Sequence, residues 1–372
     1  MALRLKVTDW IDATRWRWLL EDADGRFVAD HAVRLDPASR EYRGFCELGQ
    51  YLDYHAPVAT PAAQLQALGQ WIGERVFGGL RDALRQRCRA PAEAVQVLIP
   101  AAAHELLARP FEIACFADGK RFGEAGLRFV YQGEAATAGT PLRGAALRLL
   151  AVFSLPVRAN PLNLRRERYR LQQLVRSLNQ TRGMAVELRV LQYGATRETL
   201  REALEEGEGW DLVHLSGHGL QGELLLETEE GGNDPIDAAA LGDLLALTRE
   251  RLQLLILDAC YSGAASHAAA RAQVGLETSR AAGLVDEALT ETARTPLPSL
   301  GFALAAELDC AVFAMRYPVG DAFATELMLG LYEKLLDKRQ RLPAALQLAL
   351  GEALKYFNFI FVEFSSYLRK LW

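Results

Sequence analysis

One cysteine and one histidine stand where a short apolar run of the sequence stops at small residues. The run Leu254–Leu257 ends at Asp258-Ala259-Cys260, and Ser262-Gly263 follows it. The run Asp211–Leu215 ends in the same way, at Ser216-Gly217-His218-Gly219. A cysteine attacks as its thiolate, and a histidine can take up the proton and return it later. This pair of residue types therefore suits nucleophilic attack on a carbonyl group.

Both apolar runs have the length and composition of buried strands in an α/β sheet. In open sheets of this class, ligands and catalytic groups lie at the carboxyl ends of the strands. Gly219 has no side chain, so its backbone can approach a substrate carbonyl closely. We therefore expect the backbone N–H groups of Gly219 and Cys260 to face the developing oxyanion.

The remaining cysteines and histidines that we weighed have no such setting. A cysteine at the end of a buried strand is often only a small apolar residue, so Cys260 alone would carry little weight. His218 lies about 40 residues upstream of Cys260, and the presence of this partner favours a catalytic role for the cysteine. We interpret His104 as a structural polar residue and His214 as a packed core residue. The other cysteines are predicted to be structural: Cys46, Cys88, Cys115 and Cys310.

Composition excludes several classes of protein. The 372 residues are 50% hydrophobic and carry a net charge of −5, which predicts about two domains and argues against direct binding of nucleic acid. The first residues lack the apolar core of a signal peptide, and no window offers the ~20 apolar residues of a membrane helix. Five scattered cysteines without a C-x-x-C pair favour neither a zinc site nor disulfides. We expect a cytoplasmic protein without a cofactor or metal.

Apolar periodicity predicts strands that alternate strictly with helices after residue 145. This pattern is typical of an α/β fold with a mainly parallel central sheet flanked by helices. Before it, a supporting α/β domain is expected over residues 1–140, including one long helix over Leu65–Arg89. The second domain is expected over 145–350 with an irregular insert at 264–298. The aromatic segment 351–372 is expected to pack on the core as a last strand or helix, or else to offer a surface for another element.

The two motifs together resemble the CHAT family of caspase-like cysteine peptidases, within the clan of caspases, metacaspases and separases. The resemblance is carried by Val213–Gly219 and Leu257–Gly263. It extends to Val97–Pro100 with Leu107–Glu112, to Ala311–Asp321, to the helix with Phe323, Tyr332 and Leu335, and to Ala344–Leu346. It covers roughly residues 90–350 and implies a thiol protease, a hydrolase with His218 as base and Cys260 as nucleophile. It also implies that the first half is a degenerate copy of the caspase fold.

Around the cysteine, the sequence differs from the more common CHAT motif and is similar to that of metacaspase-like peptidases. In those relatives, an aspartate two residues before the cysteine lines the primary substrate pocket. Carried onto Asp258, this implies cleavage after Arg or Lys, because a buried carboxylate favours a cationic partner. The alternative is that Asp258 only bonds nearby backbone groups. The insert contains Arg271, Arg280 and Arg294, which are candidate self-cleavage points unless the insert is merely a surface loop.

Two functions of different classes follow. The first is a cysteine endopeptidase in a regulated bacterial stress or antiviral defence pathway, acting on a protein substrate such as a pore-forming effector. A regulatory partner or an additional domain would then control it, and neither nucleic acid nor a membrane is expected as a direct partner. The second is a catalytically silent caspase-like scaffold that acts through protein–protein interaction.

Overall fold

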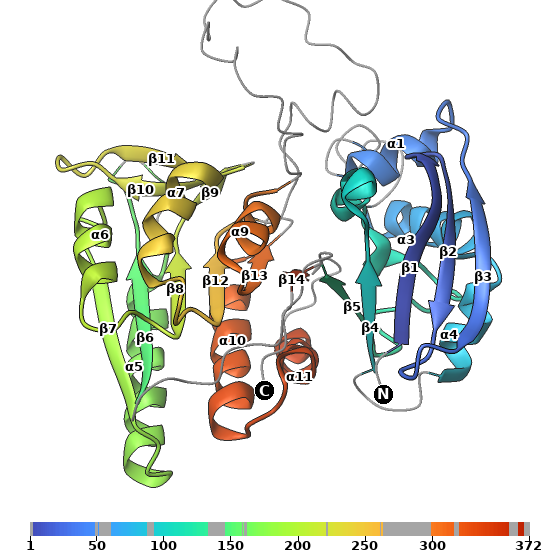
Figure 1. The fold of residues 1–372 in the computed structure, drawn as a ribbon. Helices are drawn as coiled ribbons and strands as arrows, with labels where there is room; N and C mark the ends of the chain where they lie inside the picture. Colours follow the sequence, from blue (N-terminus) through green and yellow to red (C-terminus); the bar gives the residue numbers. More distant parts are fainter. Residues whose placement is uncertain are drawn as a thin grey trace, which may run out of the picture.

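A single 11-stranded sheet runs through the computed structural model, with strand order β3-β2-β1-β4-β5-β14-β13-β12-β8-β6-β7 (Figure 1). The structure describes residues 3–48, 51, 61–87, 93–132, 146–157, 159, 162–220, 222–260, 262, 299–315, 320–356 and 364–367. The strands of this sheet are β1 (Leu3–Asp12), β2 (Arg15–Glu21), β3 (Phe27–Arg34), β4 (Glu93–Leu98), β5 (Leu127–Gln132), β6 (Leu147–Phe153), β7 (Val186–Gln192), β8 (Leu212–Ser216), β12 (Leu254–Asp258), β13 (Ala311–Met315) and β14 (Phe364–Tyr367).

In the second half of the chain, five neighbouring strands are parallel: β7, β6, β8, β12 and β13. Every residue of β8, β12 and β13 is buried, as expected for parallel strands that helices cover on both faces. The structure therefore confirms the predicted α/β fold with a mainly parallel central sheet. Its helices are α5 (Leu164–Thr181), α6 (Arg197–Glu205), α7 (Ala238–Leu245), α9 (Leu300–Leu308), α10 (Asp321–Tyr332) and α11 (Leu342–Tyr356).

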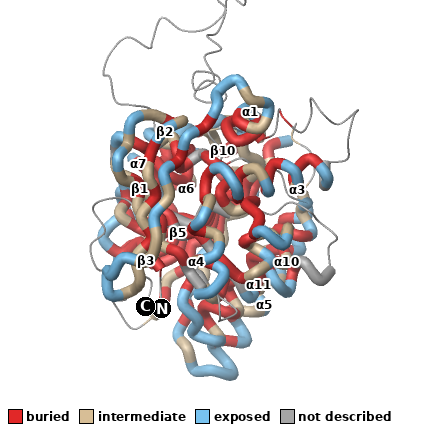
Figure 2. Tube along the Cα trace, turned by 90° about the vertical axis from the view of Figure 1, so that its right-hand side faces the viewer, coloured by how far each residue is buried: buried red, intermediate tan, exposed pale blue. Residues whose placement is uncertain are grey.

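Alternate residues along each parallel strand enter two different cores. Leu254 and Ile256 of β12 pack with α5, α10 and α11, whereas Leu255 and Leu257 pack with α6, α7 and α9. Buried residues gather in the interior, and exposed residues are spread along the outer helices, the loops and the edge strand β3 (Figure 2). The period-2 alternation of strand side chains thus decides which helices can reach each residue of β8 and β12.

The first half of the chain extends the same sheet. Strand β4 is parallel to both β1 and β5, and β1, β2 and β3 form an antiparallel meander at the edge. Trp18 lies at the centre of this half, stacked on Phe77 and edge-on to Phe111. Strand β14 joins the halves, because it pairs in parallel with β5 and antiparallel with β13. The helices of this half are α1 (Arg40–Cys46), α3 (Pro61–Trp71) and α4 (Leu80–Arg87).

The prediction of one long helix over Leu65–Arg89 is wrong. Helix α3 passes into a π-helical turn, Ile72–Phe77, and the chain then breaks before α4 begins. The break occurs at Gly78, whose φ of 47° is a left-handed conformation that favours glycine. A Cβ atom there would lie 2.3 Å from Cε1 of His31, so a side chain could not be placed without displacing that ring.

Small β-strands form a separate sheet above the carboxyl edge of the parallel strands. Strand β10 (Glu223–Glu227) pairs with β9 (Gly219–Leu220) and with β11 (Asn233–Asp237). The insert at 264–298, with Arg271, Arg280 and Arg294, lies outside the described residues. Within the described part of the chain, no helix combines the length and apolar character that crossing a membrane requires.

Candidate active site

The two predicted motifs lie side by side because β8 and β12 are neighbouring parallel strands. Their register pairs Leu254 with Leu212 and ends with Asp258 opposite Ser216. The ladder continues one step further, since the N–H of Gly217 donates to the carbonyl of Asp258 at 3.2 Å. His218 and Cys260 are each two residues beyond the last paired position. The structure therefore brings both residues to the same edge of the sheet, and both are partly exposed there.

Close backbone packing explains why glycine stands on each side of His218. A Cβ atom on Gly217 would lie 2.6 Å from the carbonyl oxygen of Ser154, which follows β6. A Cβ atom on Gly219 would lie 2.1 Å from the carbonyl oxygen of Cys260. Both distances are shorter than real carbon–oxygen contacts, so any side chain at these positions would push the strands apart. Glycine is required here for space, because neither residue has a positive φ.

The small sheet of β9, β10 and β11 holds the segment around His218 in place. The N–H of Leu225 in β10 donates to the carbonyl of His218 at 2.9 Å. Two residues along the same strand, the buried carboxylate of Glu227 accepts from the N–H groups of Leu155 and Gly194 at 3.0 and 2.9 Å. One strand therefore fixes the histidine segment to the loops that follow β6 and β7.

The turn after Cys260 is held by Ser262, which is 0% exposed. Its hydroxyl donates to the carbonyl of Leu257 at 3.2 Å and accepts from the N–H of Met315 at 3.0 Å. Its carbonyl accepts from the N–H of Gly301 at 2.9 Å. Ser262 thus ties the cysteine turn to β12, β13 and α9. The sequence pattern indicated a tight exit at this position but not these contacts.

Cys260 differs from the other described cysteines in exposure. It is partly exposed, whereas Cys46, Cys115 and Cys310 are buried. Burial raises the pKa of the Cys310 thiol to about 12 and that of Cys115 to about 11, and it also raises the pKa of Cys46. A raised thiol pKa keeps the group protonated and unreactive at neutral pH. Their environments agree with the structural roles that we expected for these three residues.

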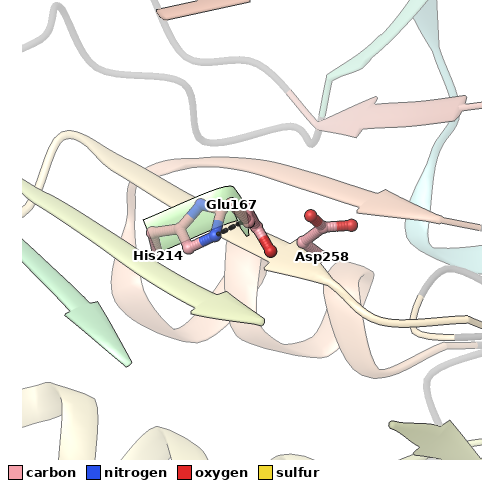
Figure 3. Close-up of side chains that lie close together, drawn as sticks. All are labelled: Glu167, His214 and Asp258. Atoms are coloured by element: carbon pink, nitrogen blue, oxygen red, sulfur yellow. Dashed lines mark hydrogen bonds and ion pairs between the residues drawn. The ribbon is translucent and has the colours of Figure 1, made fainter. Parts of the chain in front are cut away.

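Asp258 is 6% exposed and lies on the face of the sheet that α5 and α10 cover. Its carboxyl contacts Glu167 of α5, and Figure 3 shows Glu167 between Asp258 and His214. Burial raises the pKa of Asp258 well above its ordinary value, and the nearby carboxyls of Glu167 and Asp321 raise it further. Among the described residues, no backbone N–H donates to its carboxyl; residues 261 and 263 lie outside them, so the alternative considered from the sequence stays a prediction.

His214 is buried, as expected, but it belongs to a polar network that the sequence did not reveal. Its Nε2 lies 2.9 Å from Oε1 of Glu167, and its Nδ1 lies 3.1 Å from the hydroxyl of Tyr332. The hydroxyl of Ser216 donates to Oε2 of Glu167 at 2.8 Å. Burial, followed by the charges of Glu167 and Asp258, raises the pKa of Tyr332 well above its ordinary value. His214, Glu167 and Asp258 come from three elements that are far apart in the sequence.

Strands β8 and β12 make this an α/β protein in which His218 and Cys260 lie at the carboxyl edge of a parallel sheet, where such folds place their sites. The model of the CHAT domain family matches residues 2–285, about three quarters of the chain, and the chain belongs to this family. The match includes the first half of the sheet as well as both motifs.

Comparison with solved structures gives a distant likeness. The crystal structure of the Saccharomyces cerevisiae separase–securin complex matches with a TM-score of 0.48 and 9% sequence identity. The match covers 94% of this chain and 29% of the separase chain, so the chain spans less than a third of that length. Comparison with curated proteins gives no match.

Proposed function

We propose that the protein is a cysteine endopeptidase in which Cys260 is the nucleophile and His218 is the general base. The observation that carries this proposal is the register of β8 and β12, which places His218 and Cys260 at equal steps past the paired residues Ser216 and Asp258. Membership of the CHAT family and the partial exposure of both side chains support it.

The chemistry follows from these two residues and the backbone beside them. His218 removes the proton from the Cys260 thiol, and the thiolate sulfur attacks the carbonyl carbon of the scissile peptide. The N–H groups of Gly219 and Cys260 stabilise the resulting oxyanion. His218 then protonates the leaving amine, so the peptide C–N bond breaks and a thioester forms. Water, deprotonated by His218, hydrolyses the thioester and releases the carboxylate product and the free thiol.

Asp258 is proposed to select Arg or Lys on the amino-terminal side of the cleaved bond. It is two residues from Cys260, and the charges of Glu167 and Asp321 act on its carboxyl. Three carboxyl groups in one region favour a cation, because a guanidinium or ammonium group would offset the cost of burying them ionised. Self-cleavage after Arg271, Arg280 or Arg294 follows as a further proposal. Intact masses of the wild type and of Cys260→Ala test it, and masses that differ only by the substituted side chain would exclude it.

The test is a panel of fluorogenic peptides that differ only in the residue before the cleaved bond. The wild type is expected to cleave the Arg and Lys peptides, Cys260→Ala and His218→Ala to cleave none, and Cys310→Ala to match the wild type. Faster cleavage after Leu or Asp would contradict the role of Asp258 while keeping the peptidase assignment. Equal signals from the wild type and Cys260→Ala would contradict the peptidase itself and leave the scaffold function. A role in bacterial stress or antiviral defence is an expectation from the family resemblance alone.

A further inference from the structure

We propose that Glu167, His214 and Asp258 form a binding site for a divalent transition-metal ion such as Zn²⁺. One nitrogen or oxygen atom from each of the three side chains lies within 4.8 Å of the others, and all three residues are buried. They come from the different elements α5, β8 and β12, so the packing of the helix on the sheet fixes their relative positions (Figure 3). A rigid set of ligands from several elements is what a metal site requires.

Groups outside this set hold two of the ligands in the orientation that coordination needs. Tyr332 contacts Nδ1 of His214 at 3.1 Å, and if it accepts the Nδ1–H proton, the lone pair of Nε2 points toward Glu167. Ser216 donates to Oε2 of Glu167, which leaves Oε1 facing the imidazole. Hydrogen bonds of this kind, from the far nitrogen of a histidine and to the second oxygen of a carboxylate, are the usual outer contacts of metal ligands.

The charge of the cluster is an independent reason to expect a cation. Asp258 is nine-tenths buried, and within the described part of the chain its carboxyl receives no hydrogen bond from an N–H or hydroxyl group and forms no ion pair with a lysine or arginine. It contacts a second carboxyl, that of Glu167. Two buried carboxyl groups in contact require either a shared proton or a positive charge between them. A divalent ion would balance both carboxylates.

The donor set decides between classes of ion. One imidazole nitrogen with two carboxylate oxygens suits Zn²⁺ better than Ca²⁺ or Mg²⁺, which prefer six or more oxygen ligands. Three protein ligands would leave one position of a tetrahedral ion for water or a substrate atom. The ion would occupy the carboxyl of Asp258, so it would compete with a cationic substrate side chain. The prediction that the bound ion inhibits cleavage rests on the proposed function, whereas the prediction that the ion binds does not.

The experiment measures Zn²⁺ binding by titration calorimetry in the double variant Cys260→Ala/His218→Ala. This background removes the thiol and imidazole of the proposed dyad, which could bind zinc themselves. We expect one saturable site, and we expect Co²⁺ at this site to show a visible spectrum without thiolate charge-transfer bands. Asp258→Asn and Glu167→Gln, which conserve shape, should each weaken Zn²⁺ binding by at least tenfold. Tyr332→Phe should weaken it by about 10–100-fold, as is typical for outer contacts of metal ligands.

Glu227→Gln, which changes a buried carboxylate outside the cluster, is the matched control and should bind Zn²⁺ like the background. Thermal unfolding of each variant shows whether it is folded. If Glu167→Gln does not fold, Asp258→Asn and Tyr332→Phe decide the question. Absence of saturable binding in the background, or equal affinity in the background and Asp258→Asn, would overturn the metal site and leave a shared proton in its place. Because the background is inactive by design, this result is separate from the test of peptidase activity.

Discussion

Gly219 packs so closely on Cys260 that a Cβ atom added to it would lie 2.1 Å from the Cys260 carbonyl oxygen. The residue after the proposed base therefore contacts the backbone of the proposed nucleophile directly. This contact makes the two strand ends one rigid unit and places the N–H groups of both residues in the same region. The proposed catalytic geometry therefore requires a residue without a Cβ atom at position 219.

The first prediction concerns this contact. Gly219→Ala should lower kcat/KM on the order of 10²-fold, because the added methyl group displaces Cys260 and the oxyanion donors by a fraction of an ångström or more. Thermal unfolding should show that the variant remains folded. Gly351→Ala is the matched control. Gly351 lies in helix α11, and a Cβ atom added to it would meet nothing within 4 Å. Full activity in Gly219→Ala would show that the close contact between residue 219 and the Cys260 carbonyl is not needed for catalysis.

The second prediction concerns the turn that follows the cysteine. Ser262→Ala should lower the free energy of unfolding by about 1–3 kcal/mol, because the buried N–H of Met315 loses its acceptor. Denaturant titration measures the change. Ser177→Ala, an exposed position in α5, should change stability by less than about 0.5 kcal/mol. Equal effects of the two substitutions would mean that the Ser262 hydroxyl does not stabilise the turn.

The third prediction concerns cysteine reactivity. Iodoacetamide at neutral pH should modify Cys260 of the folded protein well before Cys310 or Cys115, whose pKa values of about 12 and 11 leave almost no thiolate below pH 9. Peptide mapping by mass spectrometry reports each site separately. In denaturant the difference should disappear, because burial no longer raises either pKa. Faster labelling of Cys310 than of Cys260 in the native protein contradicts the assignment of the nucleophile.

The fourth prediction concerns substrate choice. Asp258→Asn should lower kcat/KM for Arg and Lys peptides by about 100-fold or more, because a buried cation would lose its anionic partner. Asp243→Asn removes the same charge from an exposed position in α7 and should leave the rates unchanged. Peptides that lack a basic residue should lose much less with Asp258→Asn. A uniform loss over all peptides would indicate that Asp258 supports the structure rather than selecting the substrate.

Most of the fold could be predicted from local patterns of the sequence. Apolar runs predicted the strands β8 and β12, and the alternation of strands with helices after residue 145 is also observed. The parallel order of these strands then brings His218 and Cys260 to one edge, which follows from the topology of any α/β sheet. The break at Gly78 was missed because the apolar spacing continues across it, and the contact that excludes a side chain there, with the ring of His31, belongs to another part of the chain.

The buried network could not be predicted from the sequence for the same reason. Glu167 lies 47 residues before His214 in the sequence, and Tyr332 lies 118 residues after it. Glu167 lies at helical spacing between Leu164 and Leu171, so the sequence pattern could place it on the buried face of α5, but not beside His214. Only the packing of α5 and α10 on one face of the sheet reveals that these side chains meet Asp258.

The most direct measurement of the central claim uses a library of natural peptides analysed by mass spectrometry. The wild type should generate new termini, mainly after Arg or Lys, while Cys260→Ala and His218→Ala should generate none. The two single variants and the double variant should be equally inactive, because residues that act as one unit do not lose activity additively. New termini that are equally abundant with the wild type and Cys260→Ala, or absent from both, would contradict the assignment of Cys260 and His218 as a catalytic dyad.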